Sequence, residues 1–518
     1  MIYRTLSLLT VCSLSLVVLA GCAKNPATGK MNLVLLSEDA EFESGYNVVS
    51  EAIKKYGLYK EKPGLYDYYD NLAKDLVQVT ERKDKPFEFI MLDSQTFNAW
   101  ATPGYINMYR GIMPFFNSEG EFLAVLAHES AHVTARHSVR GQTTSTISNV
   151  LLTAGAALLA SKTQSQEVRN LALGAGVVAA KLGMAKYSRS FEDEADALAL
   201  RYMERMNYDP REAVNVYHMM ARYKDLDNSI YQYFHDGQNK PQSPFYDLLG
   251  SHPAPEDRVV GVERRVGKLT ADFKPQGRDR YLEMLDGIAF GPNFRKYGTA
   301  GKRTIYNPEE RFTWQLPEGF YIQHSNEQWR AYNNQTKTTA AIAVKQVKKS
   351  EDPEETLRVM FPKIRQLKKV NIAGLSGYTG IVDVVKKGQF GSYRKVAVQR
   401  VFGLKGAKDI AAEEGVSERK FFSMVFSTTA QQFDKLDAGF FASAKKLKLL
   451  TAKQADQIKP TYVQVYTVRK GDTIHKLSQR MAFGGLRQEW FLALNNLSSS
   501  DMLKIGQKVK LVIDPNQK

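Results

Sequence analysis

The chain has 518 residues, 43% of them hydrophobic and 24% charged, a balance that excludes a disordered or fibrous protein and allows several hydrophobic cores. The formal net charge of +16 predicts attraction to anionic partners. Lysines scattered between Lys345 and Lys459 fit a surface that meets anionic envelope polymers or lipid head groups, although a merely solvated basic face explains them equally well. No nucleic acid partner is expected, because the N-terminus indicates export.

Residues 1–21 predict an export signal that ends at a lipidated cysteine. One positive charge, Arg4, precedes an apolar run, and small residues then lead to Cys22. This end resembles a bacterial lipobox, which implies that Cys22 carries lipid and becomes the mature N-terminus. The alternative is a plain signal peptide or a single membrane anchor, although the run is short for a spanning helix. Cys12, the other cysteine, would leave with the signal, so no disulfide is expected.

The next segments predict two helices and a small group of strands. Ser37–Tyr56 reads as a helix with Ser37 as N-cap and acidic residues in its first turn, and Leu65–Thr80 reads as another. Phe87–Met91 alternates like a strand. Phe97–Met108 then predicts two short strands about a Pro-Gly turn.

The first metal-binding pattern ends the apolar run Phe122–Val133, which predicts a helix. His128 and His132 are four residues apart and share one helical face, where two imidazole nitrogens can hold one metal ion. Glu129 lies about 100° round the helix, which is wrong for a third ligand but suits a general base acting on water. The alternative is that these residues fell at this spacing by chance on an ordinary amphipathic helix.

A second pattern argues against chance. Tyr187–Leu200 again has helical periodicity, with Glu192 and Asp196 on one face beside apolar residues. Carboxylates rarely point towards a buried side without a metal or a partner. Two histidines and a distant helical glutamate, with one position left for water, are typical of catalytic zinc sites. The sequence therefore predicts one Zn²⁺ ion per chain.

These two stretches resemble the HtpX-like and CaaX-prenyl-protease family of zinc metallopeptidases, which joins an HExxH helix to a later SRxxExxAD helix. Residues Ser188 to Asp196 match the second motif position by position. The resemblance implies that Glu192 is the third zinc ligand and that Asp196 orients a ligand histidine. It also implies a mainly helical, zincin-type domain with a small sheet. One departure is Ala131, where the family usually has Gly; both are small, and we expect no loss of activity.

The strand pair around the Pro-Gly turn resembles the family's NAxATPGG edge strand. The resemblance implies that a peptide substrate adds itself as a further strand beside the metal. The residues expected to contact it are Asn98, Ala99, Trp100 and Ala101. A plain hairpin is the alternative. Tyr105 replaces the second Gly of the motif, so the backbone must avoid a left-handed conformation there.

Two apolar runs, Ile147–Ala160 and Leu171–Ala185, lie between the metal helices. Membrane members of the family have spanning helices in comparable places, but these runs are too short to cross a bilayer and are interrupted by charges. Buried or groove-lining helices are expected, with membrane contact as the alternative. A further helix is predicted from Asp209-Pro210 through Tyr223.

His252 lies in the segment Ser251–Val259, between a polar loop and a following arginine. In the resembling family, a His-Pro segment at this place can swing over the zinc in periplasmic members. We expect His252 either to fill the fourth metal position and silence a protease, or to stabilise an oxyanion. The alternative is a helix-capping or solvated histidine.

Residues 305–455 predict an α+β domain of unknown role. Strand-like runs such as Ala340–Val344 and Lys395–Val401 alternate with helices expected near Pro353–Leu367 and Ala430–Lys445. The region shows no metal-binding or nucleophile pattern.

The last unit, residues 463–513, resembles a LysM module, a small βααβ fold. Gly471 and Asp472 predict the turn from the first strand into a helix that Asp472 or Thr473 caps. The resemblance implies binding to N-acetylglucosamine-containing glycan, that is, peptidoglycan, through Gly471, Asp472, Thr473 and Ile474. A module that serves only for packing is the alternative.

These features predict an α+β chain in five parts: a lipoprotein signal peptide (1–21), a zinc metallopeptidase domain (22–270), a linker (271–304), an α+β domain (305–455) and a LysM module (463–513). The expected function is a zinc endopeptidase of the bacterial envelope that cleaves misfolded or envelope proteins for quality control. Ala23 after Cys22 favours the periplasmic face of the outer membrane over the inner membrane. The alternatives are an envelope assembly factor or chaperone that uses the zinc fold to bind clients, and a peptidoglycan-anchored scaffold.

Overall fold

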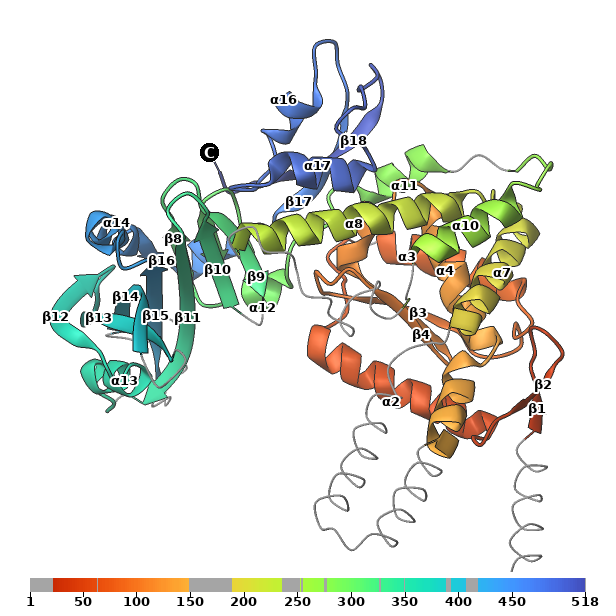
Figure 1. Cartoon of the computed structure of the whole chain (residues 1–518), viewed down its shortest axis with the longest axis horizontal. Helices are drawn as coiled ribbons and strands as arrows, with labels where there is room; N and C mark the ends of the chain where they lie inside the picture. The colour runs from red at the N-terminus through yellow and green to blue at the C-terminus, as the bar shows by residue number, and fades with distance from the viewer. Residues whose placement is uncertain are drawn as a thin grey trace, which may run out of the picture. The chain divides into compact units, whose positions relative to one another are not determined.

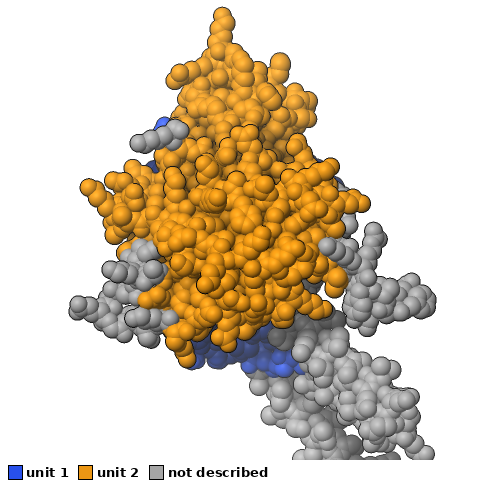
Figure 2. Space-filling view, turned by 90° about the vertical axis from the view of Figure 1, so that its left-hand side faces the viewer, with its two compact units in different colours: residues 1–222, 242–285 blue, residues 223–241, 286–518 orange. Residues whose placement is uncertain are grey.

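The computed structural model describes residues 22–62, 64–148, 189–234, 252, 255–273, 277–325, 328–348, 350–387, 393–406 and 418–517. The chain divides into two compact units (Figure 2), unit 1 with residues 1–222 and 242–285 and unit 2 with residues 223–241 and 286–518. The expected export signal, nearly all of the two apolar runs and the loop before His252 lie outside the described residues. None of the described helices is long and apolar enough to cross a membrane.

A three-stranded sheet lies in unit 1, with the order β3 (Glu88–Leu92), β5 (Tyr105–Tyr109), β4 (Ala99–Thr102). Strand β3 runs parallel to β5, and β4 runs antiparallel to it, joined by the predicted Pro-Gly turn. Gly104 in this turn has φ +88°, a conformation that favours glycine, whereas Tyr105 is already in the strand. The two expected strands are therefore confirmed, and β4 is an outer strand of the sheet.

Helix α2 (Glu38–Tyr56) covers one face of this sheet. Ser37 is its N-cap and accepts a hydrogen bond from the amide of Ala40, as the sequence predicts. Val49 packs with Ile90, Leu92 and Tyr109 of the strands. Gly45 permits this close approach, because a Cβ there would lie 2.2 Å from the carbonyl oxygen of Pro103.

Most of the remaining helices of unit 1 lie above and to the right of this sheet in Figure 1. The expected helix at 65–80 is confirmed as α3 (Leu65–Gln78), and the helix expected from 209 to 223 runs further, as α8 (Glu212–Phe234), into unit 2. The others are η1 (Arg110–Phe115), α4 (Glu119–Thr134), α7 (Arg189–Arg205), α10 (Pro255–Val266) and α11 (Arg278–Leu285). A short hairpin of β1 (Cys22–Lys24) and β2 (Met31–Leu33) precedes them.

Unit 2 is built on a seven-stranded antiparallel sheet with the order β12-β13-β14-β15-β11-β10-β9. Its strands are β9 (Tyr321–Ser325), β10 (Gln328–Asn333), β11 (Thr338–Lys348), β12 (Arg365–Ile372), β13 (Leu375–Lys387), β14 (Tyr393–Lys405) and β15 (Glu418–Thr428). A second sheet, with the order β16-β8-β7-β6, consists of β6 (Thr299–Ala300), β7 (Thr304–Asn307), β8 (Phe312–Gln315) and β16 (Leu447–Leu449).

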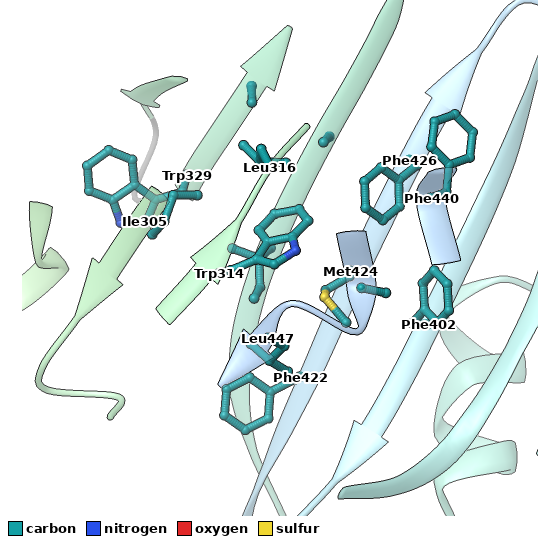
Figure 3. Packing of buried hydrophobic residues seen from close by; sticks show 14 of the residues in the cluster. Ile305, Trp314, Leu316, Trp329, Phe402, Phe422, Met424, Phe426, Phe440 and Leu447 are labelled. Carbon is teal, nitrogen blue, oxygen red and sulfur yellow. The ribbon is translucent and has the colours of Figure 1, made fainter. Parts of the chain in front are cut away.

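The core of unit 2 is aromatic (Figure 3). Trp314 is fully buried among Phe422, Phe426 and Phe440, and its indole N–H donates to the carbonyl of Ser443 at 3.1 Å. Helix α14 (Phe433–Ala444), close to the expected range, supplies Phe440. The α+β class expected for this region is therefore confirmed.

The helix expected over Pro353–Leu367 is wrong in its second half. Helix α13 (Pro353–Met360) ends early, and Arg365 begins the edge strand β12. Pro362 explains the break, because a proline disfavours a helical conformation in the residue before it. Pairing of β12 with β13 then satisfies the backbone beyond it.

The segment 271–304, expected as a linker, contains regular structure in both units. Unit 1 extends through α11 to Leu285, whereas α12 (Phe294–Tyr297) and β6 belong to unit 2. Backbone hydrogen bonds also join Gly287 and Phe290 to the first strand region of the C-terminal module. The boundaries expected from the sequence therefore do not coincide with the two compact units.

The C-terminal module has the predicted βααβ order. Strand β17 (Tyr462–Thr467) pairs antiparallel with β18 (Lys508–Ile513), with α16 (Ile474–Ser478) and α17 (Arg487–Asn495) between them and α15 (Ala452–Asp456) before them. Of the two candidate caps, Thr473 is the N-cap and accepts from the amide of Lys476 at 3.1 Å. Asp472 instead accepts from the amide of Arg469 at 2.7 Å and closes the turn.

Candidate metal centre

Helix α4 holds the two predicted histidine ligands. Ser118 caps its first turn by accepting from the amide of Glu121, and nearly all of the helix is buried. His128 and His132 project from one face, and their Nε2 atoms are 3.0 Å apart. Two imidazole nitrogens at this separation can bind one ion.

Helix α7 packs against α4 (Figure 1). This packing brings Glu192 to the two histidines. Its Oε2 lies 3.5 Å from Nε2 of His128, and its Oε1 lies 3.5 Å from Nε2 of His132. Glu192 is 1% exposed, and its Oε1 accepts no hydrogen bond from the described residues. A buried carboxylate oxygen that faces two imidazole nitrogens fits a metal ligand, and this donor set suits zinc.

Each predicted ligand histidine has an ionisation state set by its surroundings. Burial lowers the pKa of His132 well below its usual range, so this imidazole is neutral, the form that binds a metal. Burial also acts against a charge on His128, but the hydrogen bonds that its ring donates to Asp196 and Glu192 outweigh burial and raise its pKa to about 9. Metal binding at His128 therefore competes with a proton.

Asp196, which the family resemblance implies as the residue that orients a ligand histidine, lies beside His128. Its Oδ1 lies 2.9 Å from Nδ1 of His128, which leaves Nε2 of that ring to face the metal group. Arg258 of α10 holds the same carboxylate with Nε at 2.9 Å and Nη2 at 2.6 Å. Burial raises the pKa of Asp196, but the hydrogen bonds from Arg258 and His128 hold it below its usual range. Arg258 was not among the predicted site residues, although the sequence showed an arginine after the His-Pro segment.

Glu129 lies near the three predicted ligands and is not a member of the group that could hold a metal ion. It is 1% exposed, and its Oε1 accepts no hydrogen bond from the described residues. Burial raises the pKa of Glu129, and the nearby His252 and His128 lower it. A carboxylate with a raised pKa can both take and return a proton near neutral pH.

His252 is brought into the site from a distant part of the sequence. It is 3% exposed, with Nδ1 2.8 Å from Oε2 of Glu192 and Nε2 3.4 Å from Oε1 of Glu129. The ligand atoms of His128, His132, Glu192 and His252 all lie within 4.8 Å of one another, so the four could hold one ion together. A merely solvated His252 is therefore wrong.

Two further residues near the site were not predicted from the sequence. His137 is fully buried, and its Nδ1 lies 2.9 Å from Nδ1 of His132. Its Nε2 lies 3.1 Å from Glu194 on α7. The available signal was a third histidine five positions after His132, together with a carboxylate midway between Glu192 and Asp196.

The predicted substrate strand lies close to this group, because β4 packs against α4. Ala99 and Ala101 are buried, whereas Asn98 and Trp100 are partly exposed. The carbonyl of Asn98 accepts from the amide of Tyr109 on β5, and its side chain accepts from the amide of Ala99 at 2.9 Å.

The residues predicted for lipidation and glycan binding are distant in sequence from the metal group. Cys22 is exposed and begins β1. In the C-terminal module, Gly471 has φ +86°, and Ile474 begins α16 after the Thr473 cap.

An HExxH helix packed against a second helix that supplies a buried glutamate defines unit 1 as a zincin-type metallopeptidase domain. Residues 67–266 match the model of Peptidase family M48, and residues 466–512 match the model of the LysM domain. The chain therefore contains a peptidase M48 domain and a LysM domain. The matches concern these two regions of the chain and do not confirm the narrower HtpX or CaaX-prenyl-protease branch.

Curated relatives match the peptidase region. A beta-barrel assembly-enhancing protease of Vibrio cholerae is 30% identical over 207 residues, 39% of each chain, and that of Escherichia coli K12 is 25% identical over 224 residues, 42% of each. The mitochondrial metalloendopeptidase OMA1 of Schizosaccharomyces pombe is 28% identical over 263 residues, 50% of this chain and 70% of that protein. The chain thus spans less than half the length of the two bacterial relatives. The similarity to each relative therefore concerns the peptidase region.

Among solved structures, cyanobacterial PsbP from Synechocystis sp. PCC 6803 covers 29% of this chain and 94% of its own, at 8% identity and a TM-score of 0.23.

Proposed function

We propose that this protein is a zinc-dependent endopeptidase of the bacterial envelope that hydrolyses peptide bonds in misfolded or envelope proteins as part of quality control. The convergence of His128, His132 and Glu192 beside the buried Glu129 carries the proposal. The names of the bacterial relatives support an envelope location, and the LysM match supports contact with peptidoglycan.

Bound zinc would polarise the scissile carbonyl and lower the pKa of water at the site. His128, His132 and Glu192 would hold the ion, while Asp196 fixes the tautomer of His128. Glu129 would take a proton from the attacking water as the water oxygen bonds to the carbonyl carbon. Glu129 would then return that proton to the leaving amine as the C–N bond breaks.

Glu129→Gln separates catalysis from metal binding. Because Glu129 is not a ligand in this scheme, the variant should bind zinc as the wild type does and lose turnover of casein by about 10²–10⁴-fold. Glu204→Gln, an exposed change on α7, is the matched control and should keep full activity. Wild-type casein turnover by purified Glu129→Gln protein would refute the proposed role.

Substrate would bind along the outer side of β4. Since Asn98 and Trp100 pair with β5, alternation along the strand directs the N–H of Ala101 away from the sheet, where an added strand can bond to it. Ala101→Pro removes that donor and is tolerated at a sheet edge. We expect a higher KM for a peptide substrate with an unchanged melting temperature; an unchanged KM would eliminate strand addition here.

His252 fits an inhibitory role better than a solvated one. Its imidazole contacts both Glu192 and the proposed base Glu129, so it occupies the space that a substrate carbonyl needs. We propose that a client must draw the His252 segment away before cleavage.

Two anchors would hold the protein at the envelope. Lipid on Cys22 would insert into a membrane, and the LysM module would bind glycan through the turn at Gly471–Ile474. Hydrogen bonds between Val468 and both Gly506 and Gln507 place the 502–506 loop beside this turn. That loop exposes Met502 (87%) and Ile505 (73%), and exposed apolar side chains beside a turn suit contact with sugar faces.

The alternative function is an envelope assembly factor that uses the zinc fold to bind clients. The names of the bacterial relatives, beta-barrel assembly-enhancing proteases, are the reason to test this alternative. Full complementation of a deletion strain by Glu129→Gln would support this alternative, whereas failure to complement would support proteolysis.

A further inference from the structure

Each histidine ligand of the candidate centre has a second ring nitrogen that needs a partner. Asp196 serves His128, as described above. For His132 we infer that His137 and Glu194 form a relay that positions the ring, with His137 acting directly and Glu194 acting through it. The inference rests on the proposed zinc centre, and both residues are positioning residues because neither contacts the reacting atoms.

The hydrogen bonds of the relay are mutually consistent. Nε2 of His132 faces the metal group, so its ring proton lies on Nδ1 and is donated to Nδ1 of His137 at 2.9 Å. His137 then carries its own proton on Nε2, which lies 3.1 Å from Oε2 of Glu194. One tautomer of each imidazole therefore satisfies both contacts and leaves the metal-facing nitrogen of His132 free of a proton.

Packing fixes the middle ring of the relay. His137 is fully buried and stacks on Phe191, with ring centroids 4.5 Å apart and planes 4° apart. The guanidinium of Arg140 lies over the ring of Phe191, 4.4 Å from the centroid of that ring. The stack fixes the plane of the His137 ring, and the contacts of its two nitrogens with His132 and Glu194 select one of the two flip orientations in that plane.

Glu194 is also held from two sides. Arg140 donates to its Oε2 at 2.8 Å, and Asn25 donates to its Oε1 at 3.3 Å. Asn25 further donates to the carbonyl of Ala135, just past the end of α4, at 3.4 Å. The chain segment next to Cys22 is thereby connected to both metal-binding helices.

Three of the carboxylates of α7 have different partners. Glu192, Glu194 and Asp196 occupy alternate positions, and the structure directs the first to the metal group, the second to His132 through His137, and the third to His128. Groups that orient a metal-bound histidine commonly contribute 10–100-fold to metal affinity. We expect a contribution of this size from His137.

The test measures zinc affinity of the full chain by competition with a chromogenic chelator, using the metal alone as probe. His137→Phe keeps a ring for the stack on Phe191 and removes both nitrogens. We expect its zinc affinity to fall about 10–100-fold, with an altered visible absorption of the cobalt-substituted protein. His218→Phe, at an exposed position of α8, is the matched control and should change neither quantity.

The outcomes separate this inference from the proposed function. If the wild type binds no zinc, the proposed centre itself is wrong. If the wild type binds zinc and folded His137→Phe binds it equally well, only the relay is overturned. If His137→Phe does not fold, Glu194→Gln decides instead: it keeps the shape and weakens the acceptor, so a several-fold loss of zinc affinity supports the relay and unchanged affinity overturns it.

Discussion

Asp196→Ala tests the buried charge arrangement behind the metal group independently of metal. Asp196 is 4% exposed and accepts hydrogen bonds from Arg258 at 2.9 and 2.6 Å. Its removal leaves the guanidinium of Arg258, itself 6% exposed, without its main partner. Breaking a buried ion pair from one side costs about 3–5 kcal/mol of the free energy of unfolding.

The remaining contacts of Arg258 set the expected magnitude. Its Nη1 still lies 2.8 Å from Oε2 of Glu192, so part of the charge stays compensated. We therefore expect the lower end of the range, about 3 kcal/mol. For a domain of this size that loss corresponds to a melting temperature lower by roughly 6–12 °C.

The assay is thermal unfolding followed by circular dichroism in the presence of EDTA, so that loss of zinc cannot contribute. Asp193→Ala, an exposed change on the same helix, is the control and should alter stability by less than about 0.5 kcal/mol. If Asp196→Ala melts together with the control, the ion pair does not stabilise the domain and the reasoning fails.

The other predictions concern regulation and anchoring. His252→Ala should raise basal casein cleavage and self-cleavage, because it frees the space beside Glu129; depressed turnover with zinc retained would instead show that His252 assists the reaction. Cys22→Ser should move the protein from membrane to soluble periplasmic fractions, and retention of that variant in membranes, with no lipid label on the wild type, would rule out lipidation. Deletion of Gly471–Leu511 should abolish pull-down by purified peptidoglycan, and undiminished pull-down would assign wall binding elsewhere.

The sequence by itself determined the features that depend on neighbours along the chain. Helical periodicity put His128 and His132 on one face of their helix and Glu192 and Asp196 on one face of a second helix, because residues four apart are adjacent on any α-helix. The cap at Ser37 was likewise readable, since a cap depends on a few consecutive residues.

Tertiary structure decided which distant groups meet. Nothing in local spacing requires Arg258 to reach Asp196, or His137 to connect His132 with Glu194, because these contacts depend on how α4, α7 and α10 pack. The end of α13 shows the same division. A helix end before Pro362 could be predicted from the sequence alone, but only pairing with β13 made the following residues a strand. The sequence supplied the ligands, and packing supplied the groups that hold them in place.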